Sequence, residues 1–169
     1  GVALADVRRH PVEPLLQHYG VKTRWIDLVE YVWVALWFGC HELQTRGRYG
    51  HHSRRNPETA ESPWAYVTLV EIGSPQATAV AGVSRTDRAR LIDLRTATPS
   101  IYVRPHAQHA LLFAAGDWSP AKDPDLSEFE MGTIRIPLRE ALSWLGSGVS
   151  LTPYVLFPPA DRDEGFRRF

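Results

Sequence analysis

Residues 16–27 read Leu-Gln-His-Tyr-Gly-Val-Lys-Thr-Arg-Trp-Ile-Asp, and residues 32–38 read Val-Trp-Val-Ala-Leu-Trp-Phe. The first stretch carries several polar side chains that can bind or catalyse. The second stretch is too apolar to lie in solvent. Neither a surface loop nor a plain hydrophobic core needs such a density of donors and charges beside aromatic residues. This part of the chain is therefore expected to organise both the fold and a functional site.

The apolar spacing around this stretch predicts two helices. Residues 12–19 form a short helix in this interpretation, with Gly20 capping its C-terminal end. Residues 21–27 are then an extended or turn segment. Apolar residues recur at three-and-four spacing over residues 28–43, which predicts a second helix. Asp27 stands where its carboxylate can cap that helix, and this structural role is compatible with a functional one.

The rest of the chain alternates between polar and strand-like segments. Residues 44–63 are polar and rich in arginine and histidine, which predicts a mobile surface loop. Strands are predicted at 64–72, 89–94, 100–103, 110–114 and 133–137. A helix at 138–145, closed by Gly146, and a last helix at about 161–169 follow. This order predicts an α+β fold with a mixed or antiparallel sheet, in a single domain spanning residues 1–169.

Composition narrows the class of protein. The chain is 44% hydrophobic and 22% charged, which is typical of a globular protein. Nineteen cationic and nineteen anionic side chains balance, so there is no strong signal for a nucleic-acid or anionic-membrane partner. The single cysteine, Cys40, fits a reducing compartment and a cytoplasmic location, and we expect it to be a buried, inert thiol. No run of 18 apolar residues occurs, so no membrane span is expected.

Two polar groups near Gly20 are candidates for ligand contacts. His18 and Gln17 can project from the helix end into a cleft, where an imidazole can hydrogen-bond a ligand or titrate near neutral pH. The alternative is a histidine bonded to a neighbouring backbone carbonyl. Arg24 offers a forked donor suited to phosphate or carboxylate. Its alternative role is an internal salt bridge, with Asp27 or Glu30.

The sequence offers little for metals or for other familiar catalytic sites. Cys40-His41 and His51-His52 are adjacent pairs, whereas structural zinc sites use spaced pairs. We therefore expect no metal. The chain has neither a phosphate-binding glycine loop nor a Gly-x-Ser-x-Gly nucleophile elbow.

Residues 16–27 resemble the signature of the FRG domain family, which reads roughly Q-H-[YH]-G-x-x-T-R-[LW]-[LI]-D and is followed by a helix with A-L-x-F. A later family element places an arginine before Q-x-[GA]-x-[FL], and Arg104, Gln108 and Ala110 fit it. Residues 156–161, with Gly165 after them, resemble the family's L-F-P-D-L-x-G ending. The resemblance covers residues 15–169. The family's upstream Arg-Gly strand has no counterpart in Val7-Arg8-Arg9-His10, so we expect that N-terminal strand to be missing.

The resemblance implies an ADP-ribosyltransferase-like core with a pocket for NAD or a similar nucleotide, and a bacterial toxin or defence effector. Such a protein would act in the cytoplasm or be delivered into a target cell, on a macromolecular target that the sequence does not identify. A late glutamine can bind ribose hydroxyls but brings no negative charge. Only Asp27, or a carboxylate elsewhere in the chain, could then stabilise a developing cation. The implied catalytic residues are Arg24, Asp27 and Gln108, and the implied ligand-binding residues are Gln17, His18, Tyr19, Thr23 and Arg104.

The resemblance leaves two further readings open. The same side chains would serve a non-catalytic module that binds a ligand or another protein without turnover. The chain would alternatively be an inactive fragment of a larger protein.

Overall fold

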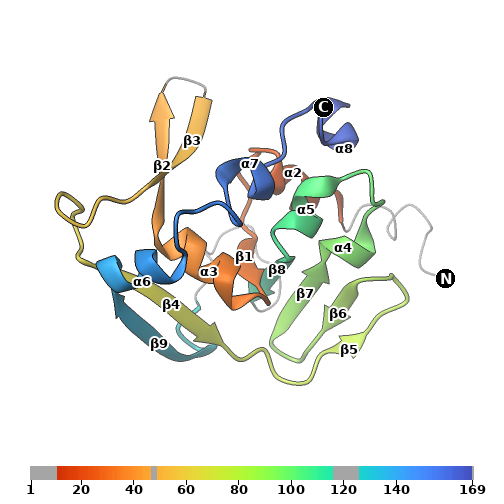
Figure 1. Cartoon of the computed structure of the whole chain (residues 1–169). Coiled ribbons are helices and arrows are strands. Elements are labelled where there is room, and N and C mark those ends of the chain that lie inside the picture. Colours follow the sequence, from red (N-terminus) through yellow and green to blue (C-terminus); the bar gives the residue numbers. More distant parts are fainter. Residues whose placement is uncertain (1–10, 47–48, 116–125, 169) are drawn as a thin grey trace.

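Antiparallel pairing organises the strands of this protein. The structure is a computed structural model that describes residues 11–46, 49–115 and 126–168 (Figure 1). Every strand pair in these ranges is antiparallel, and the helices are short. The expected α+β class with an antiparallel sheet is confirmed. Residues 1–10, on which the expectation of a missing N-terminal strand rests, lie outside the described residues.

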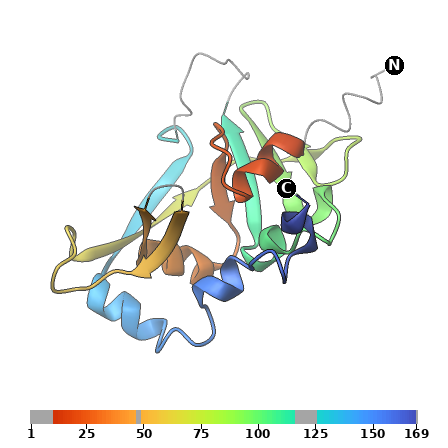
Figure 2. The same ribbon diagram turned by 90° about the horizontal axis from the view of Figure 1, so that it is seen from above.

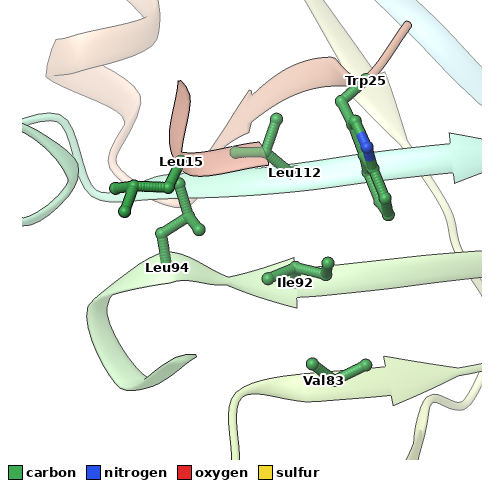
Figure 3. Close-up of a cluster of buried hydrophobic side chains, with 6 residues drawn as sticks. All are labelled: Leu15, Trp25, Val83, Ile92, Leu94 and Leu112. Atoms are coloured by element: carbon green, nitrogen blue, oxygen red, sulfur yellow. The ribbon is translucent and has the colours of Figure 1, made fainter. Parts of the chain in front are cut away.

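The main sheet has five strands in the order β1-β8-β7-β6-β5. These are β1 (Ile26–Val29), β8 (Ala110–Ala115), β7 (Ala89–Asp93), β6 (Val83–Arg85) and β5 (Gln76–Ala77). Strand β8 reads as a nearly continuous apolar run because both faces of the sheet are covered there. On one face, Leu112 packs in the cluster that Figure 3 shows, formed by Leu15, Trp25, Val83, Ile92, Leu94 and Leu112. On the other face, Phe113 packs against Ala89 and Phe129.

Helix α3 (Val32–Gly39) links this sheet to a two-stranded ribbon of β4 (Trp64–Val70) and β9 (Glu130–Pro137). Its sequence is apolar on all sides; its later residues are covered on more than one side, whereas Val32 and Trp33 at its start are exposed. Leu36 and Cys40 pack against α6 (Leu138–Trp144) and Ala65 of β4. Trp37 packs against Leu156 of α7 (Pro153–Leu156). Burial raises the pKa of the Cys40 thiol, which agrees with the expected buried, inert cysteine.

Short helices gather at one end of the main sheet (Figures 1 and 2). They include α2 (Val12–His18), α4 (Leu94–Ala97), α5 (Val103–Ala107) and α8 (Glu164–Arg167). Helix α5 contacts α2, α4 and α7. The predicted glycine cap of α2 is present, since Gly20 has a φ of 95°, a conformation that costs a glycine little. This packing brings α2 beside residues more than 80 positions later in the chain.

The second predicted helix, over residues 28–43, is wrong at both ends. Residues 26–29 are strand β1, in which Asp27 lies opposite Leu112 of β8, and the helix begins only at Val32 and ends at Gly39. Asp27 therefore does not cap it. The capping position belongs to Tyr31, which makes no side-chain cap. The apolar residues Leu28 and Val29 fit either a helix or a strand, and their pairing with β8 makes them part of a strand.

The predicted loop at 44–63 is also partly wrong. Residues His41–Arg46 (β2) and Tyr49–Arg54 (β3) form a hairpin that extends away from the main sheet in Figure 1. His41 stacks on Trp37, with ring centroids 3.9 Å apart, and His52 stacks on Phe157 at 4.5 Å. The sequence did not predict this hairpin because its side chains are mostly polar. The strands are held together by backbone hydrogen bonds, which any sequence can form. Residues 55–63 contain no helix or strand.

The remaining elements mostly follow the predictions. The strands predicted at 64–72, 89–94, 110–114 and 133–137 and the helix at 138–145 are present with ends shifted by a few residues. Residues 100–103, predicted as a strand, instead form a turn that leads into α5. The last helix is shorter than predicted, spanning Glu164–Arg167.

Candidate functional site

The two sequence segments singled out above meet at His18. This residue is the last of α2, and its Nδ1 lies 3.0 Å from Oε1 of Gln108, 90 positions later in the chain. Gln108 follows α5 and is 4% exposed. Its Nε2 donates a hydrogen bond of 2.7 Å to the carbonyl of Leu156. The contact joins α2, α5 and α7 in one buried network.

The geometry determines which nitrogen of His18 carries a proton. A carbonyl oxygen can only accept a hydrogen bond, so the Gln108 amide must direct its Nε2 toward the Leu156 carbonyl. Its Oε1 then faces His18. The His18 Nδ1 must therefore be the donor. Its Nε2 then lies 3.5 Å from Oδ1 of Asp27, a distance longer than a hydrogen bond. The expected alternative for His18, a bond to a neighbouring backbone carbonyl, is replaced by this side-chain pair.

Burial sets the charge state of His18. Desolvation lowers its pKa, the Asp27 carboxylate and the Gln108 hydrogen bond raise it, and the Arg104 charge lowers it again, with a lowered pKa as the net result. The His18 side chain is 4% exposed, whereas that of Asp27 is 58% exposed. A neutral imidazole thus stands directly behind a carboxylate at the protein surface.

Arg104 fastens this network to the C-terminal segment. Its guanidinium donates to the carbonyl of His18 at 2.7 Å and to that of Pro158 at 3.5 Å. It also lies over the rings of Tyr19 and Phe166, with centroid distances of 5.0 Å and 4.5 Å. A half-buried cation over aromatic faces is stabilised by the ring quadrupoles. These contacts direct Arg104 toward the chain itself.

Asp163 is a member of the network that sequence reasoning missed. It is fully buried, and its carboxylate accepts hydrogen bonds from the Tyr19 hydroxyl at 2.7 Å, the Arg104 backbone N–H at 3.0 Å and the Phe166 backbone N–H at 2.9 Å. Burial and this carboxylate raise the pKa of Tyr19. The contact to Phe166 caps α8. An aspartate just before a helix is a recognisable cap signal. The signal was missed because the helix was predicted to begin at residue 161, which would put Asp163 inside it.

The turn between α2 and β1 holds the other predicted residues. The Thr23 hydroxyl donates to the side-chain oxygen of Gln17 and accepts from the backbone N–H of Trp25 at 3.2 Å. These bonds close the turn around Gly20. Arg24 is half-buried. Glu30, one of the two partners expected for Arg24, pairs with Arg95 at 2.6 Å.

Seven of the eight predicted residues thus fall into two groups, and Arg24 lies in the turn that holds the second group. His18, Tyr19, Asp27, Arg104 and Gln108 lie in one connected set of contacts. Gln17 and Thr23 form a separate contact in the adjoining turn. Among the described residues there is no group of three His, Cys, Asp or Glu side chains arranged to hold a metal. None of the helices within those residues combines the length and apolar character needed to cross a bilayer.

Comparisons with known protein families, proteins and structures identified no relative of this chain. No protein-family model matches the chain, and neither the curated proteins nor the solved structures contain a significant match.

Proposed function

We propose that this protein is an FRG-type domain that binds NAD or a similar nucleotide beside Asp27 and carries out ADP-ribosyltransferase-like chemistry. The main support is the position of His18, which contacts both Asp27 and Gln108. That contact joins the two segments that the FRG resemblance implies share a site. A likeness of the antiparallel α+β architecture to an ADP-ribosyltransferase core is part of the same proposal.

Asp27 has the chemical role that such a reaction needs most. When the bond between ribose and nicotinamide breaks, positive charge develops on the ribose, and a nearby carboxylate stabilises that charge. The Asp27 carboxylate is accessible to a ligand, at 58% exposure. Arg24 lies two residues before the start of β1 and is half-buried, and it would supply a forked donor for the pyrophosphate.

The role of Gln108 in this proposal differs from the one that the resemblance implies. Both polar ends of its amide are engaged, with His18 and with the Leu156 carbonyl. Gln108 therefore orients His18 behind Asp27 rather than binding ribose. A transferase of this kind would modify a macromolecular target, as a toxin or defence effector does.

A second candidate function is a binding module without turnover. It is favoured by the internal use of polar groups, since Arg104, Gln108 and Asp163 all bind other parts of the chain. In this case Asp27 is a surface carboxylate that contacts a ligand or protein partner and stabilises no reacting group.

Thermal unfolding with NAD, ADP-ribose or AMP separates these functions. A ligand at a hundred times its dissociation constant stabilises the folded state by roughly 2.7 kcal/mol. The transferase predicts stabilisation by NAD together with release of nicotinamide. Asp27→Asn should then keep the response to ADP-ribose and lose about a hundredfold or more in nicotinamide release.

The matched control is Asp87→Asn, which changes another exposed aspartate and should behave as the wild type. Stabilisation by a nucleotide without nicotinamide release supports the binding module. If none of the three nucleotides stabilises the protein, the proposed nucleotide site is wrong.

A further inference from the structure

A second feature of the molecule lies away from His18. A hollow of about 500 Å³ opens where the end of β3 and the following residues meet α6. Leu142 contributes to the apolar part of its wall. The polar residues that line it are Arg54, Arg55, Asn56, Arg139 and Ser143.

The positive charge in this hollow is only partly neutralised. Arg54 donates to the carbonyls of Gly146 at 3.0 Å and Leu142 at 2.9 Å. Arg55 binds three carbonyls, at distances of 2.6–3.0 Å. Carbonyls orient a guanidinium but leave its charge in place. In the described part of the chain, Glu58 is the carboxylate that pairs with an arginine of this hollow, and its partner is Arg139.

The arginines are also held in place before any ligand arrives. The carbonyl contacts of Arg54 and Arg55 restrict their long side chains, which reduces the conformational entropy lost on binding. A guanidinium has five N–H donors, and Arg54 uses two of its donors and Arg55 three. Arg54 is exposed, so its remaining donors are accessible to a ligand, whereas the half-buried Arg55 contributes mainly its charge.

We propose that this hollow is a binding site for a phosphate-type anion. The negative charge and several acceptor oxygens of a phosphate match a group of guanidinium donors better than a planar carboxylate does, since a carboxylate is satisfied by one fork. This site does not depend on the proposed nucleotide site at Asp27.

Glu58 has a specific part in this proposal. Its ion pair with Arg139 joins two exposed side chains, at 69% and 75% exposure, and such pairs are weak. A bound phosphate competes with Glu58 for the Arg139 guanidinium. Glu58 therefore lowers the affinity of the site, and Arg139 raises it.

Opposite effects of two substitutions test the proposal. Binding of inorganic phosphate is measured by isothermal titration calorimetry, with ionic strength held constant by sodium chloride. Glu58→Gln should tighten phosphate binding roughly threefold and Arg139→Ala should weaken it roughly fivefold, as expected for exposed charge contacts. Arg162→Ala removes an exposed arginine elsewhere and should leave the affinity unchanged.

Additional experiments locate the bound anion and identify its chemical form. The side-chain amide signal of Asn56 in a ¹⁵N–¹H spectrum should shift on titration with phosphate. Phosphoserine and pyrophosphate, tested in parallel, show whether the site prefers the free ion, a monoester or a diphosphate. Asp27→Asn should leave phosphate affinity unchanged, and Arg139→Ala should leave the response to NAD unchanged, so the two sites can fail separately.

Two results would overturn the proposal. One is phosphate binding no stronger than that of chloride. The other is phosphate binding that neither Glu58→Gln nor Arg139→Ala alters.

Discussion

The buried carboxylate of Asp163 offers the sharpest test of how this fold is held together. Asp163→Ala removes an acceptor from the Tyr19 hydroxyl, the Arg104 backbone N–H and the Phe166 backbone N–H. All three donors belong to segments that meet around the candidate site. We expect the substitution to loosen the attachment of the C-terminal segment to α2 and α5.

The expected loss of stability follows from these contacts. Losing the helix cap at Phe166 costs about 1 kcal/mol. Leaving the Tyr19 and Arg104 donors without an acceptor costs about 1 kcal/mol or more for each. The free energy of unfolding should therefore fall by about 3 kcal/mol, which lowers the melting temperature of a chain of this size by about 6–12 °C. Asp163→Asn keeps the size and one acceptor oxygen, and should cost about half as much as the alanine substitution.

Urea unfolding followed by tryptophan fluorescence measures this difference. Asp161→Ala is the matched control, because Asp161 is an exposed aspartate of the same segment, and it should change stability by less than about 0.5 kcal/mol. Tyr19→Phe removes a single partner and should cost about 1 kcal/mol. That cost should largely vanish in the Asp163→Ala background, because the two groups share one hydrogen bond.

The reasoning is refuted if Asp163→Ala lowers the free energy of unfolding by less than about 1 kcal/mol, the typical effect of any substitution. Strict additivity of Tyr19→Phe and Asp163→Ala would also contradict a direct contact between the two side chains.

Two further predictions concern packing and pH. Gly165→Ala should destabilise the protein by about 1–3 kcal/mol in urea unfolding, because the added Cβ would lie 2.1 Å from the ring of Tyr102. Stability should also fall as the pH drops below about 6.5, the ordinary histidine pKa, because burial lowers the pKa values of His18, His41 and His52 in the folded state. In that range the unfolded chain binds more protons than the folded chain, so acid favours unfolding, and urea midpoints measured between pH 7.5 and pH 5 should decline.

Each of these predictions has a control. Gly132→Ala places a Cβ where no atom lies within 4 Å, so it should cost less than Gly165→Ala, and equal costs would contradict the steric argument. Replacing His41 and His52 together with glutamine should flatten the pH dependence. An unchanged slope would show that these two histidines do not carry it.

Local pattern was enough to predict several elements of this fold. The helix before Gly20 and the strands around residues 64–70 and 110–115 were predicted from local apolar patterns and are present in the structure. Strand β1 was different, because its residues Ile26, Leu28 and Val29 fit a helix or a strand equally well. Its pairing with β8, more than 80 residues later, decided the outcome. No window of local sequence contains that partner.

The candidate site was likewise predicted only in part from the sequence. The resemblance brought the Gln17–Asp27 and Arg104–Gln108 segments to attention, and the contact between His18 and Gln108 joins them. Residue types alone could not tell which polar groups face outward. Arg104 has the donors of a ligand-binding residue, but its nearest acceptors are carbonyls of its own chain.

The sequence by itself determined the α+β class, the apolar character of α3 and the residues able to do chemistry, because these depend on side-chain type and short-range spacing. Tertiary structure alone decided that Asp27 lies in a strand beside His18, and that Asp163 is buried among three donors. The physical reason is that a buried polar group must find a partner. That partner is chosen by which distant segments the hydrophobic core brings into contact.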